Sequence, residues 1–186
     1  MTSMDRTRNW RSFFDWGITA EEKEYAFPCD LEPNLPETLY YRGMTVHAGA
    51  ERIFPWLCQM RVAPYSYDWL DNLGRKSPGV LSPGITDLSV GQVFMTGFEL
   101  VSFEPNRHVT LRSRDLPAWL FVFGDIVITY MIVPANANRS RLLVKMRVAY
   151  PTGLVMGALM RFLLPPGDTF MMHKQLRTFK ALAETS

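Results

Sequence analysis

Hydrophobic and polar residues alternate along several segments of the chain, and a period of two is typical of strands that bury one face. These segments are rich in β-branched and aromatic residues, which favour strands. Short turn-like stretches connect most of the later ones, so the pattern predicts an antiparallel meander. The predicted strands are residues 40–47, 92–103, 108–114, 119–133 and 141–150.

Other regions carry apolar residues at intervals of three and four, which is the spacing of one helical face. Residues 50–60 predict a short helix, and a second short helix is expected near 67–73, followed by a loop. Residues 153–184 predict a long C-terminal helix. We expect the Pro-Pro-Gly sequence at 165–167 to split this helix and Asp168 to cap its second piece.

The N-terminal region has its own pattern. Thr19 and Glu22 match a capping box, in which each side chain accepts a backbone N–H at the start of a helix. Three closely spaced prolines follow, so we expect a short helix and then an extended arm over 27–38. The predicted organisation is an arm, residues 1–38, that packs on a ligand-binding domain, residues 39–186.

The order of these elements predicts an α+β fold. A curved antiparallel sheet of six to seven strands would wrap around the long C-terminal helix, with two short helices after the first strand. A sheet with one apolar face must cover that face. A single helix is too narrow to fill a strongly curved sheet, so we expect a cavity between the two.

Composition supports a globular protein that does not bind nucleic acid. The chain has 186 residues, of which 47% are hydrophobic and 13% aromatic. Its 20 basic and 18 acidic residues give a net charge of +2, which offers no electrostatic case for nucleic acid. Arg141, Lys145 and Arg147 alternate with apolar residues, so we interpret them as the solvated face of one strand.

Cysteine usage and hydropathy indicate a cytoplasmic protein. Cys29 and Cys58 form no CxxC pair, and two isolated thiols favour a reducing compartment over zinc or redox chemistry. The N-terminus has no apolar core of a signal peptide, and the longest apolar stretch is too short to span a bilayer. We therefore expect no stable membrane insertion.

Five short sequence segments add to these predictions: WGITAEE at 16–22, AERIFPWLCQ at 50–59, YSYDWLDN at 65–72, LSVG at 88–91 and LPPGD at 164–168. In these segments the chain resembles a bacterial branch of the START-like (SRPBCC) superfamily that is described as polyketide cyclase/dehydrase-like. The resemblance implies the helix-grip fold, a hydrophobic cavity and no obligatory cofactor. It does not imply one reaction, because this superfamily includes enzymes, carriers and regulators.

Three residues are candidates for catalysis: Tyr65, Asp68 and Asp125. Tyrosines could hold a carbonyl or enolate, and Asp68 could act as a general base if burial raised its pKa. The alternative is that Asp68 is an ordinary helix N-cap. A buried carboxylate in the apolar segment around Asp125 destabilises the fold unless it is paired or hydrated. Asp125 is therefore expected either in a pocket or at a solvated strand end.

Candidate ligand-binding residues share an aromatic, apolar or hydrogen-bonding side chain on the elements that would enclose the cavity. Arg112 could pair with Asp125 or a ligand carboxylate if its face points inward, although Val109 and Leu111 favour an outward position. His173 could serve as an acid or base, or lie solvated on the helix. The set is Tyr67, Trp69, Phe94, Phe98, Arg112, Phe123, Tyr130, Met172, His173 and Leu176.

No histidine pair has ligand spacing, so no metal site is expected, and no nucleotide-binding glycine motif or nucleophile elbow is present. We therefore expect a protein that binds a small hydrophobic, polyketide- or lipid-like ligand and could cyclise or dehydrate it by cofactor-free acid/base chemistry. The alternatives are a carrier or sensor, and a protein-interaction module that uses residues 1–38 or the Met-rich segment 154–164. The sequence leaves the oligomeric state open, with a homodimer among the possibilities.

Overall fold

The computed structural model describes residues 12–33, 38–67, 74 and 76–186. Within them a curved, unclosed sheet has the strand order β1-β2-β7-β6-β5-β4-β3. All neighbouring strands are antiparallel except β1, which runs parallel to β2. The strands are β1 (Asp15–Trp16), β2 (Thr38–Val46), β3 (Val93–Phe94), β4 (Phe98–Glu104), β5 (His108–Ser113), β6 (Asp125–Asn136) and β7 (Arg139–Ala149).

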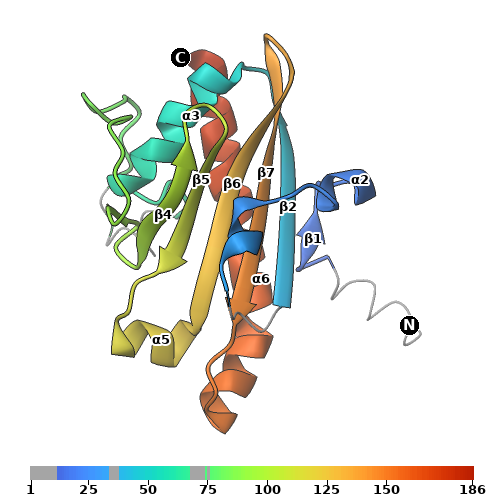
Figure 1. Cartoon of the computed structure of the whole chain (residues 1–186), viewed down its shortest axis with the longest axis vertical. Helices are drawn as coiled ribbons and strands as arrows, with labels where there is room; N and C mark the ends of the chain where they lie inside the picture. Colours follow the sequence, from blue (N-terminus) through green and yellow to red (C-terminus); the bar gives the residue numbers. More distant parts are fainter. Residues whose placement is uncertain (1–11, 34–37, 68–73, 75) are drawn as a thin grey trace.

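The long helix α6 (Leu154–Thr185) lies behind the sheet in Figure 1, and α3 (Ala50–Cys58) packs beside it. Two short helices follow β2, namely α3 and the 3₁₀ turn η2 (Gln59–Arg61). The predicted helix-grip architecture is thus confirmed. The helix expected near 67–73 falls outside the described residues for all but its first position.

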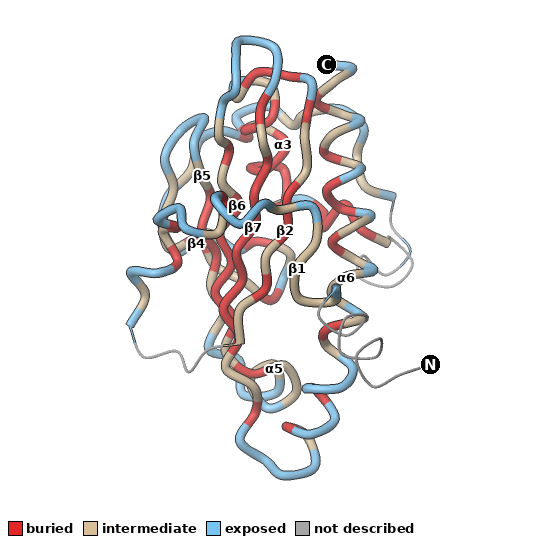
Figure 2. Tube along the Cα trace, turned by 90° about the vertical axis from the view of Figure 1, so that its right-hand side faces the viewer, coloured by how far each residue is buried: buried red, intermediate tan, exposed pale blue. Residues whose placement is uncertain are grey.

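The main core lies between the inner face of the sheet and these helices. On β7 the even-numbered residues from Leu142 to Val148 point inward, and on β6 the even-numbered residues from Ile126 to Ile132 do the same. Leu176 and Phe179 of α6 and Leu57 of α3 are fully buried against them. Figure 2 shows this core as the red segments that line both layers.

A second, smaller core covers the outer face of the sheet. Here η1 (Pro28–Leu31) follows α2 (Ala20–Lys23), lies in front of β6 and β7 in Figure 1, and buries Phe27 and Cys29 against Val127 and Leu143. The Cys29 backbone N–H donates to Thr129 Oγ1 over 3.0 Å. The segment expected to be extended is therefore partly a 3₁₀ helix, because Pro28 occupies its first turn.

The basic residues of β7 face this outer core, and our interpretation of them as solvated was wrong for two of the three. Lys145 is 8% exposed and pairs with Asp30 over 2.6 Å, and Arg147 is 5% exposed and donates to the Glu32 carbonyl over 2.9 Å. Arg141 binds Glu22 over 2.6 Å. The period of two was correct, but the N-terminal segment covers the strand and supplies acceptors for each cation.

The predicted strand at 119–133 was wrong over its first six residues. Residues 117–123 form the helix α5 (Pro117–Phe123), and β6 begins only at Asp125. Between them Gly124 has φ 78°, and a Cβ there would lie 2.0 Å from the Ala149 carbonyl oxygen. A left-handed turn that only glycine accommodates therefore separates the helix from the strand.

The predicted break at 165–167 was also wrong, because α6 is continuous across Pro165 and Pro166. Each proline lacks the N–H that would bind a carbonyl one turn earlier, at Arg161 and Phe162. Both of those residues are exposed, so water can satisfy their carbonyls. Asp168 therefore lies inside a helix and is not an N-cap.

Two smaller features complete the description. The capping box at the start of α2 is confirmed, since Thr19 Oγ1 accepts from the Glu22 N–H and Glu22 Oε2 accepts from the Thr19 N–H. Among the described helices, none has both the length and the hydropathy that crossing a bilayer requires.

Candidate functional site

A buried ion pair joins the inner face of the sheet to the long helix. Arg42 shares its strand face with Tyr40 and Val46, and it is 1% exposed. Its Nη2 lies 2.5 Å from Asp168 Oδ2 of α6, and Nη1 and Nη2 also donate to the backbone carbonyls of Phe14 and Phe13, respectively. Burial raises the pKa of Asp168, while the positive charge and hydrogen bond of Arg42 oppose that rise.

Three tyrosine hydroxyls lie close enough to Asp168 for its charge to act on them. Tyr40 Oη and Tyr150 Oη are 2.5 Å apart, and Tyr130 Oη donates to Gln175 Oε1 over 2.7 Å. Burial raises the pKa of all three tyrosines, and the negative charge of Asp168 adds to each rise. The hydroxyls are therefore protonated at neutral pH, and each has one proton to donate, which Tyr130 gives to Gln175 Oε1.

Gln175 of α6 extends the hydrogen bond of Tyr130 to the segment that follows η2. Gln175 Nε2 donates to the Pro64 carbonyl over 2.6 Å, so one amide links β6, α6 and the segment after η2. The sulfur atoms of Met60 and Met95 lie beside the same Nε2. This polar network is thus enclosed by soft apolar side chains that adapt to irregular shapes.

The inner face is sealed at one end of the sheet and less tightly packed at the other. Leu142 and Leu176, near the C-terminus of α6, are completely buried. Toward α5, Met160 is 9% exposed and Met146 is 6% exposed, and Phe123 is only half-buried. In the polar network, Arg42, Tyr40 and Tyr130 are at most 1% exposed, whereas Tyr150 is half-buried.

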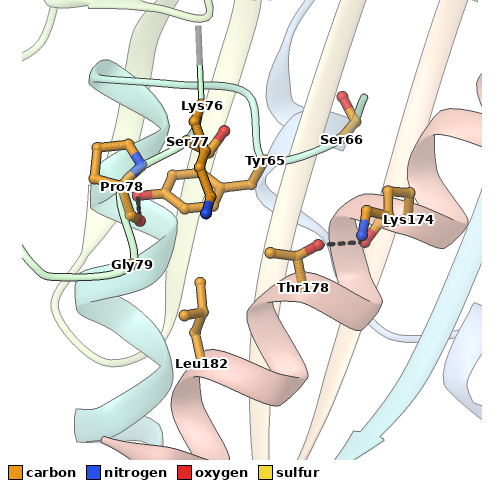
Figure 3. Close-up of a pocket in the computed structure, with 9 residues that line it drawn as sticks. All are labelled: Tyr65, Ser66, Lys76, Ser77, Pro78, Gly79, Lys174, Thr178 and Leu182. Carbon is orange, nitrogen blue, oxygen red and sulfur yellow. Dashed lines mark hydrogen bonds between the residues drawn. The ribbon is translucent and has the colours of Figure 1, made fainter. Parts of the chain in front are cut away.

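A groove of about 190 Å³ opens on the solvent side of α6, beside the loop at 76–79 (Figure 3). Tyr65 forms one wall with φ 59°, and its hydroxyl donates to the Pro78 carbonyl over 2.8 Å. The lining combines hydroxyls, two lysines and apolar carbons, from Tyr65, Ser66, Lys76, Ser77, Pro78, Gly79, Lys174, Thr178 and Leu182.

A second groove of about 530 Å³ follows the same helix and shares Lys174 with the first. Tyr67 stacks on Phe170 with ring centroids 4.2 Å apart, and His173 stacks on Trp16 at 3.8 Å. Burial lowers the pKa of His173, so its ring is neutral at physiological pH. Residues of α6 line both grooves, Lys174, Thr178 and Leu182 in the first and Pro166, Phe170 and His173 among those in the second.

The structure brings together only part of the site expected from the sequence. Asp68 and Trp69 lie outside the described residues. Asp125 and Arg112 form an ion pair of 2.7 Å on the outer face, where Glu32 also contacts Arg112 over 3.2 Å. Tyr65, Tyr67 and His173 line the two outer grooves. The predicted residues on the inner side are Phe94, Phe98, Phe123, Tyr130, Met172 and Leu176.

Sequence reasoning missed Tyr40, Arg42, Tyr150, Asp168 and Gln175. One signal was present in the sequence. Arg42 alternates in step with Tyr40 and Val46, so it shares the apolar face of that strand. A cation at such a position requires a buried acid. The sequence does not identify that acid, since 126 residues separate Arg42 from Asp168.

Comparison with solved structures places this architecture among known folds. A protein of Chromobacterium violaceum has a TM-score of 0.50 and 14% identity over 78% of this chain and 96% of its own. A protein of Mesorhizobium loti has a TM-score of 0.50 and 13% identity over 80% and 98%. Norcoclaurine synthase of Thalictrum flavum has a TM-score of 0.46 and 13% identity over 82% and 97%.

At such identities the likeness shows the fold alone. The chain has the helix-grip fold of the START-like (SRPBCC) proteins. No protein-family model matches the sequence. No curated protein matches it significantly either.

Proposed function

We propose that the inner face of the sheet and the first half of α6 bind a small, mostly apolar ligand that carries an oxygen function. The observation that carries the proposal is the Arg42–Asp168 pair with its three tyrosine hydroxyls in an otherwise apolar core. Ligand pockets combine an apolar lining with a few converging polar groups in the same way. A polyketide- or lipid-like molecule fits this chemistry.

The polar groups define how such a ligand would be oriented. Protonated tyrosines donate hydrogen bonds, so a carbonyl or enolate oxygen would meet Tyr150, whose hydroxyl can accept from Tyr40 and donate its own proton. Tyr150 is half-buried and next to the less tightly packed end of the core. The apolar part of the ligand would contact Phe123, Met146 and Met172, which line the same end.

Cyclisation or dehydration is the catalytic version of this proposal. It requires a base, and Asp168 is the acidic residue among the described groups of the inner face. One observation favours a carrier or sensor as the second candidate: the Asp168 carboxylate is already held by Arg42. Asp68 and Tyr65 stay predictions as catalytic residues, and the Tyr65 hydroxyl donates to the Pro78 carbonyl.

A matched pair of substitutions tests ligand binding. Met146 points into the core from β7, whereas Met131 points to the outer face from β6. Titration with 1-anilinonaphthalene-8-sulfonate, together with native mass spectrometry for a co-purified molecule, reports the occupied space. We expect M146W to abolish binding and M131W to retain it. Equal binding by the two variants would refute the inner site.

Enzyme and carrier are separated by the fate of the bound molecule. A co-purified compound would be extracted, returned to fresh protein and analysed by mass and chromatographic retention. Loss of one water or a new retention time with wild type, but not with Y150F or D168N, supports catalysis. Recovery of the unaltered compound supports a carrier.

A further inference from the structure

The second groove beside α6 combines flat rings with positive charge. The residues of α6 that line it recur every three or four positions, so they share one face of the helix. Its volume of about 530 Å³ lies within the usual range of roughly 300–1,000 Å³ for small-molecule sites. We call it the cationic groove and define it by Tyr67, Phe170, His173, Lys174 and Arg177.

Two stacked ring pairs form the flat part of the cationic groove. Tyr67 lies on Phe170 with ring centroids 4.2 Å apart and ring planes 2° from parallel. His173 stacks on Trp16 in the same way, at 3.8 Å and 8°. Phe170 is 53% exposed, so part of its surface still faces solvent. A planar ligand would extend this stack, and ring contacts of that kind add binding energy beyond the area they bury.

Lys174 and Arg177 place two positive charges one turn apart on the same helix face. Both side chains are exposed, and neither forms an ion pair within the part of the chain that the structure describes. Residues 169–183 include no acidic residue, so no carboxylate of α6 lies within one turn of either cation. Lys180 differs, because Glu184 pairs with it over 3.0 Å. Like charges at this spacing repel each other, and an anion bound between them would relieve that repulsion.

His173 is uncharged beside these two cations. Burial lowers its pKa, and the positive charges of Arg177 and Arg42 lower it further. Together they outweigh the Thr169 carbonyl, which lies 3.2 Å from His173 Nδ1 and acts to raise the pKa. At neutral pH the imidazole therefore offers a flat, neutral surface, and the positive charge of the groove comes from Lys174 and Arg177. Lys174 also lines the first groove, as Figure 3 shows.

We propose that the cationic groove binds a small organic anion, with a flat ring on Phe170 and a carboxylate or phosphate between Lys174 and Arg177. A helix rises by about 1.5 Å per residue, so the two cations lie about 6 and 10 Å along the axis from Phe170. A spacer of several bonds must therefore separate the ring from the anionic group. The five defining residues are not those of the inner polar network, so binding here does not depend on the proposed function.

A charged compound and its neutral counterpart test the groove. Naphthylbutanoate carries a ring, a spacer and a carboxylate, and naphthylbutanamide replaces the charge with a neutral amide. Isothermal titration calorimetry of the full chain at neutral pH measures both affinities. We expect wild type to bind the butanoate about tenfold more tightly than the amide, because two cations contact the carboxylate. The probe of the inner site, 1-anilinonaphthalene-8-sulfonate, carries its sulfonate directly on the ring and lacks this spacer.

Substitutions separate the contribution of charge from that of the ring. K174Q/R177Q should remove the preference for the butanoate and leave the affinity for the amide unchanged. R139Q is the matched control, since Arg139 is exposed in the hairpin between β6 and β7. F170L removes the flat ring and keeps an apolar side chain, so it should weaken both compounds by about three- to tenfold. All four positions are exposed, so the substitutions leave the core packing in place.

Adenosine monophosphate and adenosine give the same comparison for a phosphate. Preference for the anion in either pair supports the groove, and the pair with the larger preference identifies the anionic group. M146W should bind as wild type does, because Met146 lies on the inner face. The proposal is overturned if wild type binds neither anion at millimolar concentration or does not distinguish charged from neutral compounds. It is also overturned if R139Q loses as much binding as K174Q/R177Q, or if M146W abolishes binding.

Discussion

Arg42 Nη2 of β2 lies 2.5 Å from Asp168 Oδ2 of α6, and this buried contact ties the sheet to the long helix. The Arg42 side chain is 2% exposed and that of Asp168 is 13% exposed. Two opposite charges taken out of water depend on each other, because either one alone would remain buried without compensation. The stability of the inner face therefore depends on the pair.

The first prediction concerns that dependence. D168N should reduce the free energy of unfolding by about 3–5 kcal/mol, since it leaves Arg42 buried without a counter-charge. D125N is the control, because Asp125 and Arg112 form a pair that is roughly one-third exposed on the outer face, and such pairs contribute about 0–1 kcal/mol. Urea denaturation measures both, and a similar loss in the two variants would contradict the buried role of Asp168.

A second prediction addresses the amide that links Tyr130 to Pro64. Gln175 is 3% exposed, and both its oxygen and its nitrogen are bound. Q175L should destabilise the protein by about 1–3 kcal/mol, because it leaves a buried hydroxyl and a buried carbonyl unsatisfied. Combining it with Y130F removes one of these penalties, so thermal unfolding of the double variant should be less affected than the sum of the single changes. A strictly additive result would mean that the two side chains do not interact.

The third prediction is a pH dependence at the outer face. Hydrogen bonds from Arg141 lower the pKa of Glu22 from its ordinary value of 4.5, so the folded protein binds fewer protons than the unfolded chain just below that value. The contribution of Glu22 is therefore complete above pH 4.5 and lost as the pH falls through the folded pKa. E22Q should cost roughly 1–3 kcal/mol at pH 7, and its difference from wild type should shrink in acid. A difference that grows below pH 4.5 would reverse the assigned sign.

A fourth prediction compares two glycines with opposite roles. G124A should destabilise by more than about 2 kcal/mol, because Gly124 has φ 78° and a Cβ would lie 2.0 Å from the Ala149 carbonyl oxygen. Gly167 lies within α6, and a Cβ added there would meet no neighbouring atom within 4 Å. G167A should therefore stabilise by about 0.5–1 kcal/mol, as alanine does in a helix. Differential scanning calorimetry of both variants checks the signs, and two shifts in the same direction would be inconsistent with these assignments.

The hydrophobic pattern predicted much of the fold, because strand parity and helical spacing are local properties. The strand predicted at 40–47 matches β2 within two residues at each end, and the helix predicted at 50–60 corresponds to α3 and η2. The errors have physical causes. A short apolar run such as 119–123 fits either helix or strand, and Gly124 reveals its role only when Ala149 is beside it.

The candidate site was less accessible to sequence reasoning, since it depends on which faces meet across the fold. Tyr130 and Met172 were identified from their element and residue type, whereas Asp125 was placed near them only because it is an acid in an apolar segment. In the structure Asp125 has the parity of Val127, which faces the outer core. Which face of a strand points toward the helix depends on the tertiary structure. The residues of that strand alone do not determine it.

Both borders of the sheet end in strands of two residues, β1 and β3, and β4 carries an irregularity between Leu100 and Ser102. Strands this short offer few free backbone groups to a neighbouring chain, and a bulge turns the remaining ones away. At both borders the outermost strand therefore gives an added strand little backbone to pair with.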